Sequence, residues 1–240
     1  MGKVAASISG MIAILLTTGC GPVNQPTRPM AAQMEDVRRL AVVVDLAGDF
    51  TVIKERTVVG AAHAGAGGAA QLPVVGVVFL AEAIVSAFTA HKEDSKHAAK
   101  VAPHLADVAP KQTLLEALLG TLRSGDRFGA IEILERPPEG SARSQFDGVL
   151  LVKLRAWGLV VVAMNPDLLS AFVDFEVRML RTSAPDAIWE ESNAMIGQGR
   201  HPLEAYLMDP ALARQEITEA FETTGQRLAY ELLYPRGVKR

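Results

Sequence analysis

The chain has 240 residues, a formal net charge of −3 at pH 7 and 49% hydrophobic residues. This length and hydrophobic content suffice for one sizeable domain with its own core. The mildly acidic balance contains no basic stripe, so the sequence predicts no nucleic-acid partner.

The start of the chain has the pattern of a bacterial signal peptide. Lys3 supplies a positive charge, an apolar run extends over residues 4–16, and small residues follow at 17–21. The apolar run is shorter than the roughly twenty residues that a membrane-spanning helix needs. We therefore expect residues 1–19 to be a signal peptide that is removed on export.

Cys20 is the only cysteine of the chain. Together with Gly19 it resembles the lipobox of bacterial lipoproteins, although Thr17 stands where that family has leucine. The resemblance implies that Cys20 carries the lipid anchor and becomes the mature N-terminus. Gly21 after the cysteine resembles the sorting signal for the outer membrane, with the protein facing the periplasm. The alternative is an ordinary secretory signal whose cysteine carries no lipid.

The composition divides the rest of the chain. Residues 20–38 are polar and proline-containing, which predicts a flexible tether between the lipid and a folded domain. A single α/β domain is expected over residues 39–235, with a Gly/Ala-rich apolar insertion at 58–90. The insertion fits either a loop followed by a buried helix or a segment that contacts a membrane or a second copy.

Hydrophobic periodicity predicts the elements of the first half of the domain. A β-branched run at 40–46 predicts a buried strand. The polar stretch at 91–110 predicts a solvated linker, with or without a frayed helix. Leucines at helical spacing predict a helix over 112–124, and a strand is expected over 128–134. The Pro-, Gly- and Ser-rich stretch at 135–146 predicts a surface loop.

The next block is rich in strands. Residues 147–154 and 158–164 are two runs that can form a hairpin. A strand at 172–179 alternates between apolar and polar side chains, and a strand at 187–196 can pair with it. The expected inward set is Val173, Phe175, Val177 and Met179, and the expected outward set is Asp174, Glu176 and Arg178.

A long amphipathic helix closes the chain. Asp209 and Pro210 are typical of a helix start, and the helix is expected to end before Pro235. Its apolar stripe is Ile217, Phe221, Thr224, Leu228 and Leu232. The pattern as a whole predicts an α/β (α+β) fold: a mixed, mainly antiparallel sheet with packing helices and a long C-terminal helix.

No pattern predicts a catalytic residue, a cofactor site or a metal site. The five histidines form no pair at helical metal-ligand spacing. The chain contains neither a nucleophile elbow nor a P-loop lysine. The glycine-rich stretch at 65–70 lacks the helix that a dinucleotide site requires. Trp157 and Trp189 fit core or interface packing better than a ligand-stacking pair.

Three segments resemble the curli-assembly-protein-like lipoproteins, which include the penicillin-binding-protein activator lipoproteins. They are the strand Phe146–Leu154, the strand Ala171–Met179 and the segment Ala187–Ser192 that follows. The resemblance covers about 40–56 and 111–234, and the insertion at 58–90 departs from it. It implies a protein without catalytic residues.

We therefore expect a non-enzymatic, membrane-anchored envelope lipoprotein that acts through protein–protein interaction in envelope assembly, secretion or support of cell-wall synthesis. Its expected partners are the membrane, through the lipid on Cys20, and either another envelope protein or further copies of itself as a homo-oligomer. The alternative is a tethered periplasmic ligand-binding protein or hydrolase. That alternative requires a polar pocket around Trp157, Trp189 and Asp45.

Overall fold

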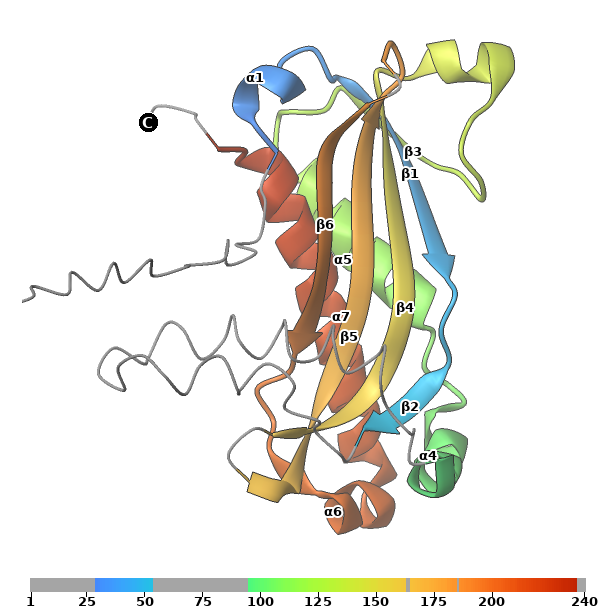
Figure 1. Cartoon of the computed structure of the whole chain (residues 1–240), viewed down its shortest axis with the longest axis vertical. Helices are drawn as coiled ribbons and strands as arrows, with labels where there is room; N and C mark the ends of the chain where they lie inside the picture. Colours follow the sequence, from blue (N-terminus) through green and yellow to red (C-terminus); the bar gives the residue numbers. More distant parts are fainter. Residues whose placement is uncertain (1–28, 54–94, 163–164, 185, 237–240) are drawn as a thin grey trace, which may run out of the picture.

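A seven-stranded mixed sheet, with two long helices packed on one face, forms the fold (Figure 1). The computed structural model describes residues 29–53, 95–162, 165–184 and 186–236. The strands are β1 Arg39–Leu46, β2 Phe50–Ile53, β3 Ala130–Ile133, β4 Gly148–Val162, β5 Asn165–Arg181, β6 Ala187–Ile196 and β7 His201–Pro202. The helices are α1 Ala31–Met34, α4 Ser95–Val101, α5 Pro110–Arg123, α6 Leu203–Met208 and α7 Pro210–Leu233, with 3-10 turns η1 Ala102–Leu105 and η2 Gly140–Gln145.

The strand order is β3-β1-β4-β5-β6, with β2 also beside β4 and β7 also beside β5. Strand β1 runs parallel to β3 and β4, and β2 runs parallel to β4. The pairs β4–β5 and β5–β6 are antiparallel and are the longest in the sheet. The predicted α/β class, with a mixed, mainly antiparallel sheet and a long C-terminal helix, is confirmed.

Strand β1 is buried on both faces over Leu40–Val44. Leu40, Val42 and Val44 lie in the main core, and Ala41 and Val43 lie in a second apolar cluster with Phe146 and Val149. A strand covered on both faces requires a continuous apolar run instead of alternation. The predicted strand at 40–46 is therefore confirmed, with its start at Arg39.

The predicted hairpin of 147–154 with 158–164 is wrong, because both runs belong to the single strand β4. The chain does not turn at Gly158. Instead β2 joins β4 there, so the second run keeps its hydrogen bonds. Gly158 has a φ of +147°, and a Cβ at this position would lie 1.8 Å from the carbonyl oxygen of Thr51. Glycine is therefore required where β2 and β4 meet.

Strands β5 and β6 form the predicted antiparallel pair. Val173, Phe175 and Val177 are fully buried on the inner face, as the alternation predicts. On the outer face Arg178 is exposed and Glu176 is half-buried. The prediction that Asp174 faces water is wrong, because its side chain is only 1% exposed. Its neighbours on this part of the outer face are largely apolar, namely Ile53, Val160, Phe172 and Ala194.

Helix α7 begins as predicted. The side chain of Asp209 accepts hydrogen bonds from the backbone N–H groups of Ala211 and Leu212. The predicted apolar stripe is buried throughout. Gly225 sits where α7 meets α5, and a Cβ there would lie 2.5 Å from the carbonyl oxygen of Leu114. This glycine therefore permits the two helices to pack closely, which outweighs its low helix propensity.

The predicted flexible tether at 20–38 is wrong for residues 29–38. Pro29 and Ala31 exchange backbone hydrogen bonds with Arg236 near the end of the chain. Met34 on α1 and Val37 after it are buried in the core. These two apolar side chains fix residues 29–38 to the domain, and residues 20–28 lie outside the described residues.

The stretch at 91–110 forms the helical alternative over 95–105, as α4 and η1, but it is not fully solvated. Val101 and Leu105 belong to the main core. Cys20 and the whole insertion at 58–90 lie outside the described residues, and the interpretations of both stay predictions. Within the described residues, no helix has the length and apolarity required to cross a membrane.

Candidate interaction site

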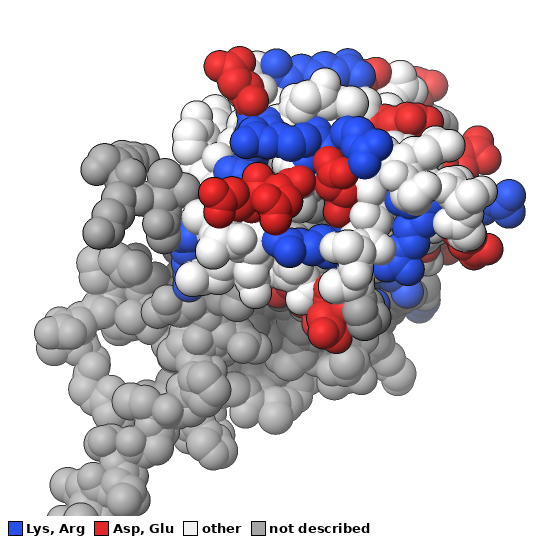
Figure 2. Space-filling model, turned by 90° about the horizontal axis from the view of Figure 1, so that it is seen from above, with Lys and Arg blue, Asp and Glu red and all other residues white. Residues whose placement is uncertain are grey.

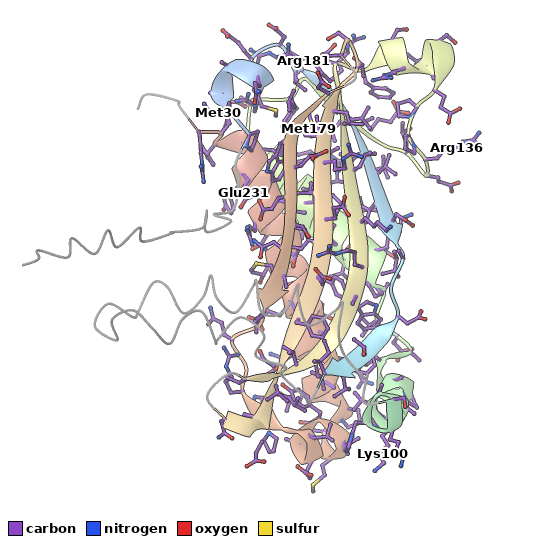
Figure 3. The ribbon with its side chains drawn as sticks, viewed as in Figure 1. Met30, Lys100, Arg136, Met179, Arg181 and Glu231 are labelled. Atoms are coloured by element: carbon purple, nitrogen blue, oxygen red, sulfur yellow. The ribbon has the colours of Figure 1, made fainter. Side chains whose placement is uncertain are left out.

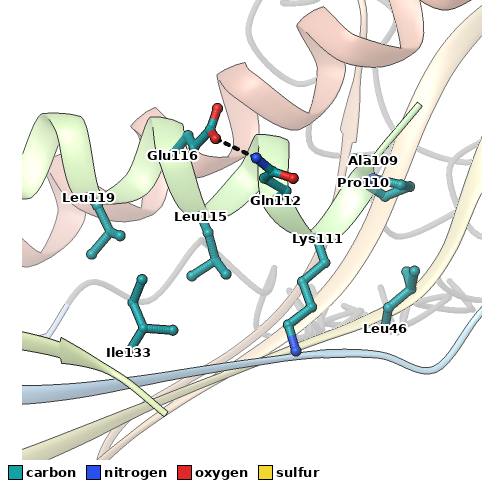
Figure 4. A pocket seen from close by; sticks show the side chains of 9 residues that line it. All are labelled: Leu46, Ala109, Pro110, Lys111, Gln112, Leu115, Glu116, Leu119 and Ile133. Atoms are coloured by element: carbon teal, nitrogen blue, oxygen red, sulfur yellow. Dashed lines mark hydrogen bonds between the residues drawn. The ribbon is translucent and has the colours of Figure 1, made fainter. Parts of the chain in front are cut away.

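An apolar groove of about 460 Å³ runs between α5 and the β3 edge of the sheet (Figure 4). Leu115 and Leu119 extend from α5 toward Ile133 on β3. Leu46, at the end of β1, continues the lining. The remaining lining residues are Ala109, Pro110, Lys111, Gln112 and Glu116. The walls are aliphatic, and the polar side chains come from the first turns of α5.

The width of the leucine stripe on α5 explains the groove. Leu114, Leu118 and Leu122 are fully buried in the main core, on the side of α5 that packs against α7. Leu115 and Leu119 lie on the adjacent face and line the groove. Five leucines within nine residues are more than one buried stripe needs. The five leucines therefore indicate a second apolar face on this helix. The sequence analysis used them only to predict that the helix forms.

The β3 side of the groove is open. Ile133 is 46% exposed and Leu46 is 39% exposed, whereas most large apolar side chains in the described part of the chain are buried. Among the described residues, β3 pairs with β1 alone. An edge strand beside an apolar groove can accept an extended polypeptide, because the edge supplies backbone hydrogen bonds and the groove receives side chains.

Arg155 and Asp174 form a buried ion pair on the outer face of the sheet. The guanidinium Nη2 lies 2.5 Å from Oδ1 of the carboxylate. Burial raises the pKa of Asp174, and Arg155 partly opposes that rise. Arg155 lies at the register shift of β4, between Leu154 and Ala156. The register shift in β4 thus brings the guanidinium of Arg155 to the carboxylate of Asp174, on the face of the sheet that alternation predicts to be exposed to solvent.

A second buried cluster joins the sheet to α7. Arg227 donates to Glu191 on β6 at 2.5 Å and to Glu231 on α7 at 2.9 Å. Its guanidinium also lies 5.8 Å from the ring centroid of Phe175. Glu190 pairs instead with the exposed Arg178 on the outer face. Glu190 and Glu191, which are adjacent on β6, therefore point to opposite faces of the sheet.

A third polar cluster fastens α6 to α7. The hydroxyl of Tyr206 donates to Glu216 Oε2 at 2.6 Å, and His201 Nε2 lies 3.0 Å from Glu216 Oε1. Burial, followed by the neighbouring Glu216, raises the pKa of Tyr206. Arg200 donates to the carbonyl of Gly197 at 2.6 Å. The carboxylate of Glu216 therefore contacts both Tyr206 and His201. None of the residues in this cluster lines the groove.

The two tryptophans pack in the core. Trp157 donates to the carbonyl of Gly48 at 3.1 Å, and its ring meets Phe50 edge-on at a centroid distance of 5.3 Å. Trp189 is 3% exposed. The two pair with β5 residues six positions apart, a separation of about 20 Å along the strand. They do not form a ligand-stacking pair, and Asp45 is exposed.

The only predicted site residue, Cys20, lies outside the described residues. In the described part of the chain, no group of three or more acidic, histidine or cysteine side chains is placed to hold a metal ion. The groove was not predicted, because the exposure of Leu46 and Ile133 depends on which strand forms the edge of the sheet.

Neither a scan against protein families nor a search of curated proteins finds a match. Among solved structures, protein XCC0632 from Xanthomonas campestris, with the family designation DUF330, is similar at 10% identity and a TM-score of 0.45, over 87% of this chain and 88% of its own. A PelC dodecamer from Paraburkholderia phytofirmans gives 14% identity and a TM-score of 0.34, over 83% and 90%. The hypothetical protein CT253 from Chlamydia trachomatis gives 8% and 0.31, over 81% and 98%. Similarities this distant assign no function.

Proposed function

We propose that this chain is a non-enzymatic, membrane-anchored envelope lipoprotein that binds another polypeptide chain in the groove between α5 and β3. The observation that carries the proposal is an open aliphatic groove beside an edge strand. Leu46 and Ile133 are exposed in this groove, whereas most large apolar side chains of the described residues are buried.

The shape and chemistry of the groove favour a polypeptide over a small polar ligand. A polar ligand needs several convergent polar groups, whereas the groove is walled by leucine and isoleucine. Gln112 and Glu116 are hydrogen-bonded to each other at 2.8 Å on the helix side. An added strand would pair with the outer edge of β3 and place alternate side chains against Leu115 and Leu119.

The lipid proposed on Cys20 would hold the domain at the envelope membrane without a spanning helix. The sequence around Cys20 favours a location at the outer membrane, facing the periplasm. The polypeptide in the groove is then another envelope protein or a second copy of this chain. The resemblance to the curli-assembly-protein-like lipoproteins supports this class of function and stays a sequence-based interpretation.

Photo-crosslinking in intact bacterial cells tests the groove. A photoreactive amino acid replaces Ile133 in one variant and Met208 in the control, because Met208 is 85% exposed on α6 and does not line the groove. We expect a discrete crosslinked species from position 133, whose mass identifies a second copy or a different protein. Equal, diffuse products from both positions would contradict the proposal.

A separate variant tests the anchor. Cys20→Ser should abolish incorporation of lipid label and move the protein out of the membrane fraction. Cys20 is the only thiol of the chain, so the change removes no other cysteine chemistry. A wild-type chain that takes up no label, together with a variant that stays equally membrane-bound, would rule out the lipoprotein assignment.

A further inference from the structure

A second exposed apolar patch lies where the N-terminal and C-terminal segments meet. Tyr230 and Tyr234, one turn apart at the end of α7, are 56% and 59% exposed. Their rings are stacked, with centroids 6.2 Å apart. Met30 is 50% exposed and forms a bridge with Arg236, two residues after Tyr234. Figure 3 shows Met30 beside this end of α7. We name Met30, Tyr230 and Tyr234 the tyrosine patch.

The patch lies at the point where the described chain begins. The carbonyl oxygen of Pro29 accepts a hydrogen bond from the backbone N–H of Arg236. Pro29 follows Cys20 by nine residues. A segment of nine residues reaches at most about 30–32 Å when fully extended and averages roughly 15–18 Å when flexible. A lipid on Cys20 would therefore keep the tyrosine patch within a short distance of the membrane surface.

The chemistry of the patch fits the interface between membrane and water. Tyrosine has an apolar ring and a polar hydroxyl, and it is enriched at the level of the lipid headgroups. Figure 2 shows basic and acidic side chains mixed over this end of the molecule.

We propose that the tyrosine patch rests on the lipid bilayer beside the anchor and orients the domain on the membrane. This proposal rests on the lipid anchor of the proposed function. The groove is lined by none of the three patch residues, so it remains accessible to a polypeptide while the patch contacts lipid.

Quenching by brominated lipid tests the proposal. The full chain carrying Tyr234→Trp is produced with its lipid and reconstituted into vesicles of phosphatidylcholine with brominated or ordinary acyl chains. The control is Met208→Trp, on the exposed α6. The native Trp157 and Trp189 are 8% and 3% exposed, and their emission is subtracted with the wild-type chain. We expect about a twofold loss of the added emission at position 234 and none at position 208.

Three results would overturn the proposal, and they are distinguishable. If mass spectrometry finds no lipid on Cys20, the proposed anchor fails and the patch loses its basis. If the lipid is present and both added tryptophans are quenched equally or not at all, the patch alone fails. If Tyr230→Ala with Tyr234→Ala halves the mass of the lipidated chain in detergent, the patch binds a second copy instead of the bilayer.

Discussion

The two faces of strand β5 differ in how well the sequence pattern predicts the burial of their side chains. On the inner face, Val173, Phe175 and Val177 are fully buried, and the side chains follow the apolar alternation without exception. On the outer face, Arg178 is exposed at one end while Asp174 is 1% exposed further along. The inner face shows what local periodicity determines. The outer face shows that burial also depends on which distant residues pack there.

The largest expected effect lies on the inner face. Phe175→Ala removes a fully buried ring that also faces the guanidinium of Arg227. We expect a loss of about 3–5 kcal/mol in the free energy of unfolding, as for other core aromatics. Urea titration measures it, and Arg178→Ala on the opposite face is the control, with an expected loss below about 1 kcal/mol. Equal losses for both would mean that the two faces do not differ.

The next effect concerns the buried pair on the outer face. Arg155→Ala leaves the carboxylate of Asp174 buried without its cation, so we expect a loss of about 2–4 kcal/mol near pH 7. Burial already raises the pKa of Asp174 above its ordinary value of 3.8. The stability that this aspartate contributes is therefore greatest below pH 3.8 and declines as the pH rises through the folded-state pKa.

Urea titrations of Arg155→Ala at several pH values check this account. The variant raises the pKa of Asp174 further, so its deficit should shrink on acidification, when the carboxyl group becomes neutral. Asp174→Asn should remove the pH dependence. A deficit that is constant from pH 7 to about pH 4 would show that Asp174 is not the titrating group.

The smallest effect comes from an aspartate in open surroundings. Asp147 accepts backbone hydrogen bonds from Arg38 and Arg39, and the guanidinium of Arg39 lowers its pKa to about 2. Its contribution is therefore present above pH 3.8 and lost as the pH falls toward 2. Asp147→Asn should cost less than about 1 kcal/mol at neutral pH, because Arg39 is half exposed.

Acid titration of the wild type and Asp147→Asn separates the two aspartates. The variant should lose the wild-type decline in stability between about pH 4 and pH 2. The pKa of Asp174 is raised, whereas that of Asp147 is lowered. If Asp147→Asn instead removes the pH dependence of the unfolding free energy above pH 4, the two pKa shifts have been assigned to the wrong residues.

Patterns within one element predicted its place in the fold. The strand at 187–196 and the capped helix that starts at Pro210 agree with the structure, because both depend on periodicity and on local capping by Asp209. The continuous strand β4 could not be predicted in the same way. It depends on β2, which pairs across Gly158 from more than a hundred residues away in the sequence.

The groove was only partly visible in the sequence. The wide leucine stripe of α5 indicates a second apolar face, but nothing local states that Ile133 lies on an edge strand or that Leu46 lies beside it. Cys20 presents the opposite case. Its signal is local and specific in the sequence, and its role rests on that pattern alone.

Binding of a polypeptide in the α5–β3 groove is best decided by crosslinking yield in intact cells. A photoreactive residue replaces Lys111, which lines the groove, and is combined with Leu46→Glu and Ile133→Glu. Met208→Glu in the same background is the matched control. We expect the double substitution to reduce the yield about tenfold or more, because it buries two charges against aliphatic walls, and the control to leave it unchanged. An undiminished yield in the double variant would show that the groove is not the binding site.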